Sequence, residues 1–367
     1  MTLATEQFIL NIGPLHPSTH GVFRMRVTMD GETIQDVEPV FGYLHRGLEK
    51  LCESHTYKQN IPITDRLDYV SAINNNWPYV MAVEKLAEIQ VPLRAEYLRV
   101  IMGELQRIAS HLLAVGSLMN DMGVFYTAFM YMFREREKII DLLEMVTGQR
   151  LLYNYMRFGG VSMDFPAEFI PALKRFLNIM PSYLDEYDSM MADNEILLSR
   201  TKGIGILTPE MAVNSSASGP LLRGSGVKWD LRKDAPYSVY DRFDFDIPTG
   251  NNGDCYDRYR VRMEEMRQSI RIINQAIEQL PSGKEKVMVP LRIRPPKGET
   301  YSQIEAPRGI LGCYIVSDGS TKPYRCHFRA PAFINLTLLQ ELLIGQKLAD
   351  AIIIFGSIDL SMGEVDR

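Results

Sequence analysis

Two histidines, His16 and His20, lie four residues apart within the N-terminal segment GPLHPSTHG. Histidines at this spacing can bind a metal from one face of a helix, but Pro17 between them disfavours a helix. Pro14 and Pro17 instead stiffen the segment, and a stiff loop that presents an imidazole can hold a proton donor near neutral pH. The alternative is two loop histidines satisfied by backbone hydrogen bonds, and composition alone favours that alternative.

A second polar cluster is the segment YLHRGLEK, in which His45 and Arg46 stand directly before Gly47. Glu49 and Lys50 follow in what should be the first turn of a helix, so positive charge is expected at the helix start. Arg46 could bind an anion, a partner carboxylate or a redox cluster. A solvated helix face is the alternative interpretation.

The third cluster, TDRLDYVS, places Asp65, Arg66, Asp68 and Tyr69 within five positions, and its apolar flanks indicate partial burial. Buried charges need partners, so we expect Arg66 to pair with Asp65 or Asp68. A phenol in such a place can donate a hydrogen bond without ionising.

The fourth cluster is Asp121 and its neighbours, in the segment NDMG at the end of a long predicted helix. A carboxylate at a helix C-terminus opposes the helix dipole, which indicates a specific partner for it. None of the four clusters identifies a function by itself.

The first element that positions these clusters is a predicted N-terminal sheet. Apolar and polar residues alternate over residues 23–29, and an Asp-Gly turn and a second extended segment follow, which predicts a β-hairpin. A further strand is expected at residues 7–11. We assign residues 1–45 to this sheet region, which carries the loop with His16 and His20.

The middle of the chain is predicted to be helical. Apolar residues recur every three or four positions, as on the buried face of a helix, over residues 92–121, 129–146, 167 to about 198, and 256–280. These helices should form a core bundle. Residues 202–252 are rich in Gly, Pro and Ser and predict long functional loops against the bundle, and we assign residues 46–285 to the bundle region.

The C-terminal region, residues 286–367, becomes β-like again. Strands are expected at residues 287–289, 312–316 and 324–328, followed by one more helix at residues 333–348 and an apolar, strand-like end. The predicted fold class is α+β, with a large helical bundle core, a small N-terminal antiparallel sheet and a C-terminal β-containing region.

Composition excludes several classes of function. The chain has 367 residues, of which 46% are hydrophobic and 23% charged, as in an ordinary soluble globular protein. The net charge of -5 disfavours a nucleic-acid partner. The longest apolar run, residues 349–355, is too short for a transmembrane segment, and we expect no signal peptide at the N-terminus. The four cysteines form no Cys-x-x-Cys pair, so we expect free thiols and no metal site: Cys52, Cys255, Cys313 and Cys326.

Six motifs in order resemble one protein family, and the resemblance covers essentially the whole chain. They are GPLHPSTHG, HRGLEK, DRLDYVS, FREREK at residues 133–138, RFGGV at residues 157–161 and the terminal MGEVDR. Together they are similar to the D (49 kDa) subunit of respiratory complex I, the proton-pumping NADH:quinone oxidoreductase. The resemblance implies a translocase-class enzyme subunit that is active only within the complex, bound peripherally at the cytoplasmic face of the cell inner membrane.

This family is similar in turn to the large subunit of nickel–iron hydrogenases, whose metals are held by two Cys-x-x-Cys pairs. Here Asp68 and Ser71 stand where the first pair would be, and Asp359, Ser361 and Glu364 stand where the second would be. Soft metals require thiolates, so a nickel site cannot be built from these residues. The cavity is therefore expected to take another ligand.

In the family that ligand is the head group of a quinone. The resemblance implies that His20 and Tyr69 bind the quinone carbonyl oxygens and that Asp121 pairs with His20. Quinone reduction consumes two electrons and two protons, so donors that stay protonated near neutral pH suit the site. Asp68 or Arg66 would tune the surroundings of Tyr69. The remaining alternative is a structural subunit that shapes a cavity without taking part in proton transfer.

The resemblance also implies partners. Electrons would come from an iron–sulfur cluster in a neighbouring B-type subunit, and His16 and Arg46 would shape the face toward that cluster. Further partners would be a C (30 kDa) type subunit, an I-type ferredoxin-like subunit and the membrane-arm subunits H and A. In one departure, many members carry a histidine where this chain has Leu152, so the cluster's potential is expected to depend less on pH. The electron donor, NADH or ferredoxin, depends on other subunits.

Overall fold

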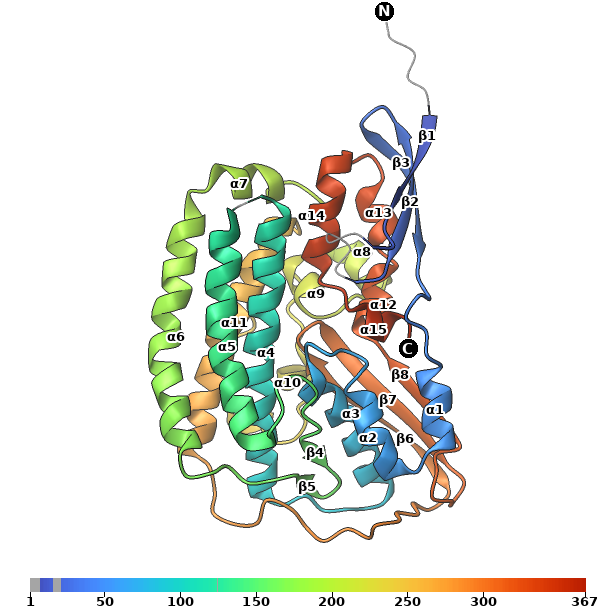
Figure 1. Ribbon diagram of the computed structural model, residues 1–367, viewed down its shortest axis with the longest axis vertical. Helices are drawn as coiled ribbons and strands as arrows, with labels where there is room; N and C mark the ends of the chain where they lie inside the picture. Colours follow the sequence, from blue (N-terminus) through green and yellow to red (C-terminus); the bar gives the residue numbers. More distant parts are fainter. Residues whose placement is uncertain (1–6, 16–20, 124) are drawn as a thin grey trace, which may run out of the picture.

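The computed structural model describes residues 7–15, 21–123 and 125–367, except for the side chains of residues 125–127 and 192. Its elements form an α+β fold in which a helical bundle lies beside small antiparallel sheets (Figure 1). The predicted fold class is therefore confirmed. Among the described helices, none is long and apolar enough to cross a membrane.

The N-terminal sheet is antiparallel and has the strand order β1-β2-β3. Met25, Val27 and Met29 on one face of its central strand are fully buried, whereas Arg26 on the other face is exposed. The alternation in the sequence thus sets which face packs on the protein. The strands are β1 (Gln7–Ile12), β2 (Arg24–Asp30) and β3 (Thr33–Val40), as predicted.

Four long helices pack together as the bundle (Figure 1): α4 (Leu93–Asp121), α5 (Phe125–Thr147), α6 (Phe169–Ala192) and α11 (Cys255–Glu278). The prediction of one helix from residue 167 to about 198 is wrong, because a second helix, α7 (Glu195–Thr201), begins after Asn194. The side chain of Asn194 accepts a hydrogen bond from the backbone N–H of Leu197 at 3.0 Å, which stabilises the new helix start.

Shorter elements surround the bundle. Three helices precede it: α1 (Leu48–Ser54), which begins after Gly47 as predicted, α2 (Tyr57–Thr64) and α3 (Ala72–Leu86). After α5 the chain forms a small antiparallel pair, β4 (Met156–Arg157) and β5 (Gly160–Val161). The region predicted as long loops also contains short helices: α8 (Pro209–Asn214), α9 (Pro220–Gly224), α10 (Leu231–Asp234) and the 3-10 helix η2 (Tyr240–Arg242).

The C-terminal sheet is antiparallel with the order β6-β7-β8, formed by β6 (Gly298–Ala306), β7 (Gly309–Ser317) and β8 (Arg325–Arg329). Two of the predicted strands are confirmed within β7 and β8, and β6 was not predicted. The strand expected at residues 287–289 is wrong, because this stretch is an extended segment whose neighbour Lys286 makes an isolated bridge to Gly160.

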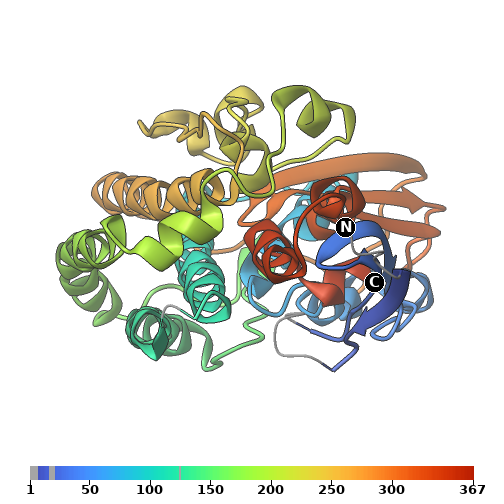
Figure 2. The same cartoon turned by 90° about the horizontal axis from the view of Figure 1, so that it is seen from above.

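The end of the chain is helical, so the prediction of one helix at residues 333–348 and a strand-like end is wrong. Four helices follow the sheet: α12 (Pro331–Leu336), α13 (Leu339–Leu343), α14 (Leu348–Ile358) and α15 (Met362–Val365). α14 packs against both α4 and α11, and a short apolar run buried on several sides does not reveal its period. Seen from above, these helices lie between the bundle and the N-terminal sheet (Figure 2).

The division into regions 1–45, 46–285 and 286–367 stays a prediction. Packing crosses its last boundary, since α3 contacts β6 and β7 extensively. The candidate cavity also crosses this boundary, because its wall contains residues from both the second and the third region.

Candidate functional site

A cavity of about 310 Å³ lies where α4 ends, beside the segment that follows α14. It brings together Tyr69, from the loop between α2 and α3, and Asp121, the last residue of α4. Its lining also contains polar and apolar side chains from these two segments and from three others: Val70, Leu113, Ala114, Ser117, Asn120, Phe129, Arg308, Asp359, Leu360 and Ser361. Two residues that the sequence placed in one site thus share one cavity, although 51 positions separate them.

His16 and His20 lie outside the described residues. Their proposed roles toward a partner and toward the ligand therefore stay predictions, as does the pairing of His20 with Asp121.

The loop that carries Tyr69 is fixed from both sides. The carbonyl oxygen of Asp68 accepts a hydrogen bond from the Asn75 side chain at 2.8 Å, and that of Val70 accepts one from Gln106 of α4 at 2.6 Å. Tyr69 itself remains 39% exposed, so its ring faces the cavity side of the loop. Burial and then the neighbouring Asp68 raise the pKa of Tyr69, which keeps its phenol protonated as a hydrogen-bond donor.

Arg308 is the cation at the cavity wall. Its guanidinium forms an ion pair with Asp68 and donates a second hydrogen bond to Asp359 Oδ1 at 3.2 Å, and all three side chains are buried. The expected pairing of Arg66 with Asp65 or Asp68 is wrong, because Arg66 is exposed and donates to the carbonyl oxygen of Pro62 at 2.6 Å.

Sequence reasoning missed Arg308, which lies 240 positions from Asp68. It occupies the tight turn between β6 and β7, whose position is held by Ser218: the Ser218 hydroxyl accepts a hydrogen bond from the backbone N–H of Ile310 at 3.1 Å. A usable signal was the motif APRG, in which a charged residue stands between the two turn-forming residues Pro307 and Gly309.

Asp359 faces the same cavity from the end of α14. Its backbone adopts a left-handed conformation with φ of 61°, and the carbonyl oxygens of the two preceding residues accept hydrogen bonds from Arg262 of α11 at 2.8 and 3.3 Å. Within the described structure, Asp359 Oδ2 is buried without a hydrogen-bond partner. A buried acceptor that faces a cavity is available to a ligand donor or to a proton.

The positions compared above with the two cysteine pairs therefore meet in space. Asp68 from the first and Asp359 from the second bind the same guanidinium. The four cysteines are all buried and free. Among the described residues, no group of three or more His, Cys, Asp or Glu side chains could hold a metal ion.

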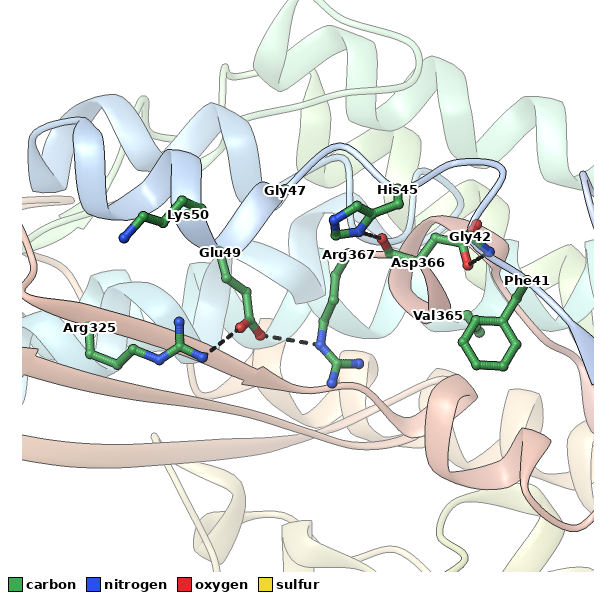
Figure 3. A pocket seen from close by; sticks show the side chains of 10 residues that line it. All are labelled: Phe41, Gly42, His45, Gly47, Glu49, Lys50, Arg325, Val365, Asp366 and Arg367. Carbon is green, nitrogen blue, oxygen red and sulfur yellow. Dashed lines mark hydrogen bonds and ion pairs between the residues drawn. The ribbon is translucent and has the colours of Figure 1, made fainter.

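A second pocket, of about 440 Å³, shows how the motifs HRGLEK and MGEVDR meet (Figure 3). The carboxylate of Asp366 accepts hydrogen bonds from the backbone N–H groups of Gly42 and Leu44 at 2.7 and 2.8 Å. The Asp366 carbonyl oxygen lies 2.8 Å from His45 Nδ1. Arg46 extends toward the first cavity and donates to the carbonyl oxygens of Arg66 and Gly363 at 3.0 and 3.5 Å.

Glu49 is the anchor of this second pocket. It forms ion pairs with Arg325 and Arg367 at 3.1 and 3.2 Å (Figure 3), and His327 Nδ1 lies 2.9 Å from its carboxylate. Burial by itself would raise the pKa of Glu49, but the backbone N–H of Phe328 and the neighbouring His327 hold it below its usual value. These contacts hold the C-terminal residues Asp366 and Arg367 against α1 and the segment before it, and they thereby fix the position of α15.

Comparison with known proteins agrees with this architecture. The sequence model of the family described as "Respiratory-chain NADH dehydrogenase, 49 Kd subunit" matches residues 121–367. The chain is 60% identical to the D subunit of NADH-quinone oxidoreductase from Dehalococcoides mccartyi and 56% identical to that from Desulforamulus reducens, in both cases over 100% of each chain. It is 54% identical to the corresponding protein of Clostridium beijerinckii, over 100% of this chain and 98% of the relative. The chain therefore belongs to the family of 49 kDa (D) subunits of respiratory-chain NADH dehydrogenase, complex I.

Proposed function

We propose that this subunit binds the head group of a quinone in the cavity between Tyr69 and Asp121 and supplies proton donors for its reduction. One observation carries the proposal: side chains from two distant motifs line one cavity of about 310 Å³ whose wall contains a buried guanidinium. A volume of this order suits a single ring with its substituents. Apolar residues such as Leu113 and Phe129 can pack against the ring, and the polar groups can orient its two oxygens.

The chemistry of the lining fits quinone reduction. The phenol of Tyr69 can donate a hydrogen bond to one carbonyl oxygen, and His20 is proposed to donate to the other, with Asp121 orienting its ring. The positive charge of Arg308 favours the negative charge that develops when electrons enter the quinone. The electrons are proposed to come from an iron–sulfur cluster held by a neighbouring B-type subunit, with His16 and Arg46 toward that side.

The proposal extends to the assembly. This subunit would contact the B-type, C (30 kDa) type and I-type subunits and the membrane-arm subunits H and A, and it would lie peripherally at the cytoplasmic face of the cell inner membrane. Proton pumping, and hence the translocase class, would belong to the whole complex. The subunits that co-purify with this chain test these statements directly, since flavin- and NADH-binding partners would identify NADH as the donor.

The decisive experiment replaces Tyr69 by Phe in the assembled complex and measures the rate of electron transfer to a quinone. The phenylalanine keeps the ring but removes the donor, so we expect quinone reduction to fall about 100-fold, the lower range for loss of a general acid. His20→Ala should act in the same direction. Transfer to an artificial acceptor that takes electrons upstream of the quinone should be unchanged.

The matched control is Tyr324→Phe, because Tyr324 is 70% exposed and does not line the cavity. An intact complex in which Tyr69→Phe and His20→Ala both keep full quinone reductase activity would show that the cavity is only structural.

A further inference from the structure

Behind the wall of the cavity, three buried carboxyl groups surround the guanidinium of Arg308. Asp68 and Asp359 bind it directly, and Glu364 of α15 lies close enough for its charge to interact with all three groups. Glu364 is 2% exposed, and its Oε1 accepts a hydrogen bond from the backbone N–H of Ala332 at 2.6 Å. In the described structure it has no ion pair of its own.

The charges of this cluster do not balance if every carboxyl group is ionised. Four further cations approach it, but each donates to backbone oxygens there. Arg262 of α11 binds those of Ser357 and Ile358, and Arg329 of β8 binds that of Ile310 at 2.6 Å. Arg46 and Arg367 donate to the carbonyl oxygens of Gly363 and Glu364, both at 3.5 Å. The phenol of Tyr69 is neutral, since its pKa is raised. Because an uncompensated buried charge is costly, the cluster should keep a proton near neutral pH.

We assign this proton to Glu364, because Asp68 and Asp359 both pair with Arg308 whereas Glu364 has no ion pair in the described structure. Burial, followed by the negative charge of Asp68, raises the pKa of Glu364 to about 8. Its place is fixed by Gly363, where a Cβ atom would lie 2.7 Å from the carbonyl oxygen of Leu67. The absence of a side chain at residue 363 thus lets the backbone of α15 lie against the loop that carries Asp68.

The cluster also reaches the cavity. Arg308, Asp359 and Ser361 all line it, whereas Glu364 is buried and does not line it. Asp359 Oδ2 has no hydrogen-bond partner in the described structure, so this oxygen can accept a proton, and the charge of Asp359 interacts with that of Glu364.

We propose that Glu364 stores a proton behind the cavity and passes it through Asp359 to the quinone bound beside Tyr69. This inference rests on the function proposed above. Reduction to the quinol takes two electrons, supplied by the partner's iron–sulfur cluster, and two protons. For one of them the O–H bond of Glu364 breaks, Asp359 accepts the proton, and a new O–H bond forms on a quinone oxygen. The carboxylate of Glu364 then regains a proton from solvent.

The test is Glu364→Gln in the complete complex, with kcat and KM for quinone reduction measured across pH. Glutamine keeps the shape and the oxygen that accepts from Ala332, but it cannot release a proton. We expect kcat to fall about ten-fold or more with KM nearly unchanged. The loss of wild-type activity above the pKa of Glu364, about 8, should disappear. The matched control is Glu341→Gln on α13, an exposed site at which no change is expected.

Infrared spectroscopy can detect the protonated carboxyl group of Glu364 without enzyme turnover. The wild-type complex should show a protonated carboxyl band that disappears as the pH is raised through about 8 and that is absent in Glu364→Gln. Glu364→Asp should shift this band and restore part of kcat. If Glu364→Gln does not assemble, Glu364→Asp decides, because an unshifted band and an unchanged pH profile would overturn the inference.

The possible failures are distinguishable. If Glu364→Gln keeps the wild-type kcat and pH profile while Tyr69→Phe is inactive, the proton store is wrong and the quinone site stands. If Tyr69→Phe and His20→Ala are both fully active, the quinone site is wrong and the proton store falls with it.

Discussion

Replacing Arg308 by Leu should destabilise the protein by an amount that grows with pH. Arg308 is buried between the carboxyl groups of Asp68 and Asp359. Leucine fills part of the space but leaves both carboxylates without their cation. Breaking a buried ion pair by removing one partner typically costs about 3–5 kcal/mol.

The protein can avoid part of this cost by binding protons. A carboxyl group with an ordinary pKa of about 4 takes up a proton at about pH 5 for roughly 1.4 kcal/mol, but at about pH 8 the same step costs roughly 5 kcal/mol. Burial raises the pKa of Asp68, and the variant loses the opposing effect of Arg308, so the folded-state pKa of Asp68 rises further above its unfolded value and stability falls as pH rises. We therefore expect a loss of about 1–3 kcal/mol near pH 5 and about 3–5 kcal/mol near pH 8.

Urea denaturation of the full-length chain at these two pH values measures the difference. The control is Arg26→Leu, since Arg26 pairs with Glu38 at a site where both side chains are 52% exposed and such a pair contributes at most about 1 kcal/mol. Adding Asp68→Asn to the Arg308 variant should recover part of the loss, because it removes one stranded charge. An equal loss at both pH values, or a loss no larger than that of the control, would refute the reasoning.

Three further predictions concern neighbouring positions. Gly363→Ala should lower both the stability of the protein and its quinone reductase activity, because the new Cβ atom would lie 2.7 Å from the Leu67 carbonyl oxygen. The control is Gly116→Ala on α4, where the nearest atom to a new Cβ would be 3.5 Å away. This control should be neutral or slightly stabilising in the same denaturation assay. Asp65→Asn should remove a pH dependence of stability. Burial raises the pKa of Asp65 to about 7, so the wild-type protein loses stability as the pH rises from about 4 to about 7. A variant whose stability falls with pH as steeply as that of the wild type would contradict this. Leu152→His should steepen the pH dependence of the midpoint potential of the iron–sulfur cluster that we propose in the partner subunit, measured by redox titration at several pH values. A wild-type slope already as steep as in histidine-bearing relatives would contradict the expected role of this position.

The sequence was most informative where a local pattern determines the outcome. Period-two alternation located the N-terminal hairpin, and long apolar periodicity located α4 and α11, because both patterns extend over many residues. It failed where tertiary contacts decide: α14 is a short apolar run whose helical form depends on packing against α4 and α11. The break at Asn194 depends on one capping hydrogen bond, and such a cap is easily overlooked within an otherwise periodic segment.

Part of the candidate site was also predictable from the sequence, and part depended on tertiary contacts. Tyr69 and Asp121 were predicted from family motifs, and both line the cavity. The ion pairing of Asp68 was predicted wrongly, because its spacing suggested the adjacent Arg66, whereas the fold supplies Arg308 from a distant turn. Adjacent opposite charges often point to different sides of a loop, so sequence proximity is a weak guide to buried pairs.

The charged residues Arg308 and Glu364 should have different roles beside the cavity. Asp68 and Asp359 come from two distant segments, and their carboxylates bind one guanidinium, that of Arg308. Arginine stays charged throughout the physiological pH range, so Arg308 can stabilise negative charge on a bound quinone but cannot donate a proton to it. Glu364, in contrast, can exchange a proton near neutral pH but does not line the cavity, so it does not contact the bound quinone directly. Loss of Arg308 should therefore weaken folding and quinone binding together, whereas loss of the Glu364 proton should lower kcat and leave KM nearly unchanged.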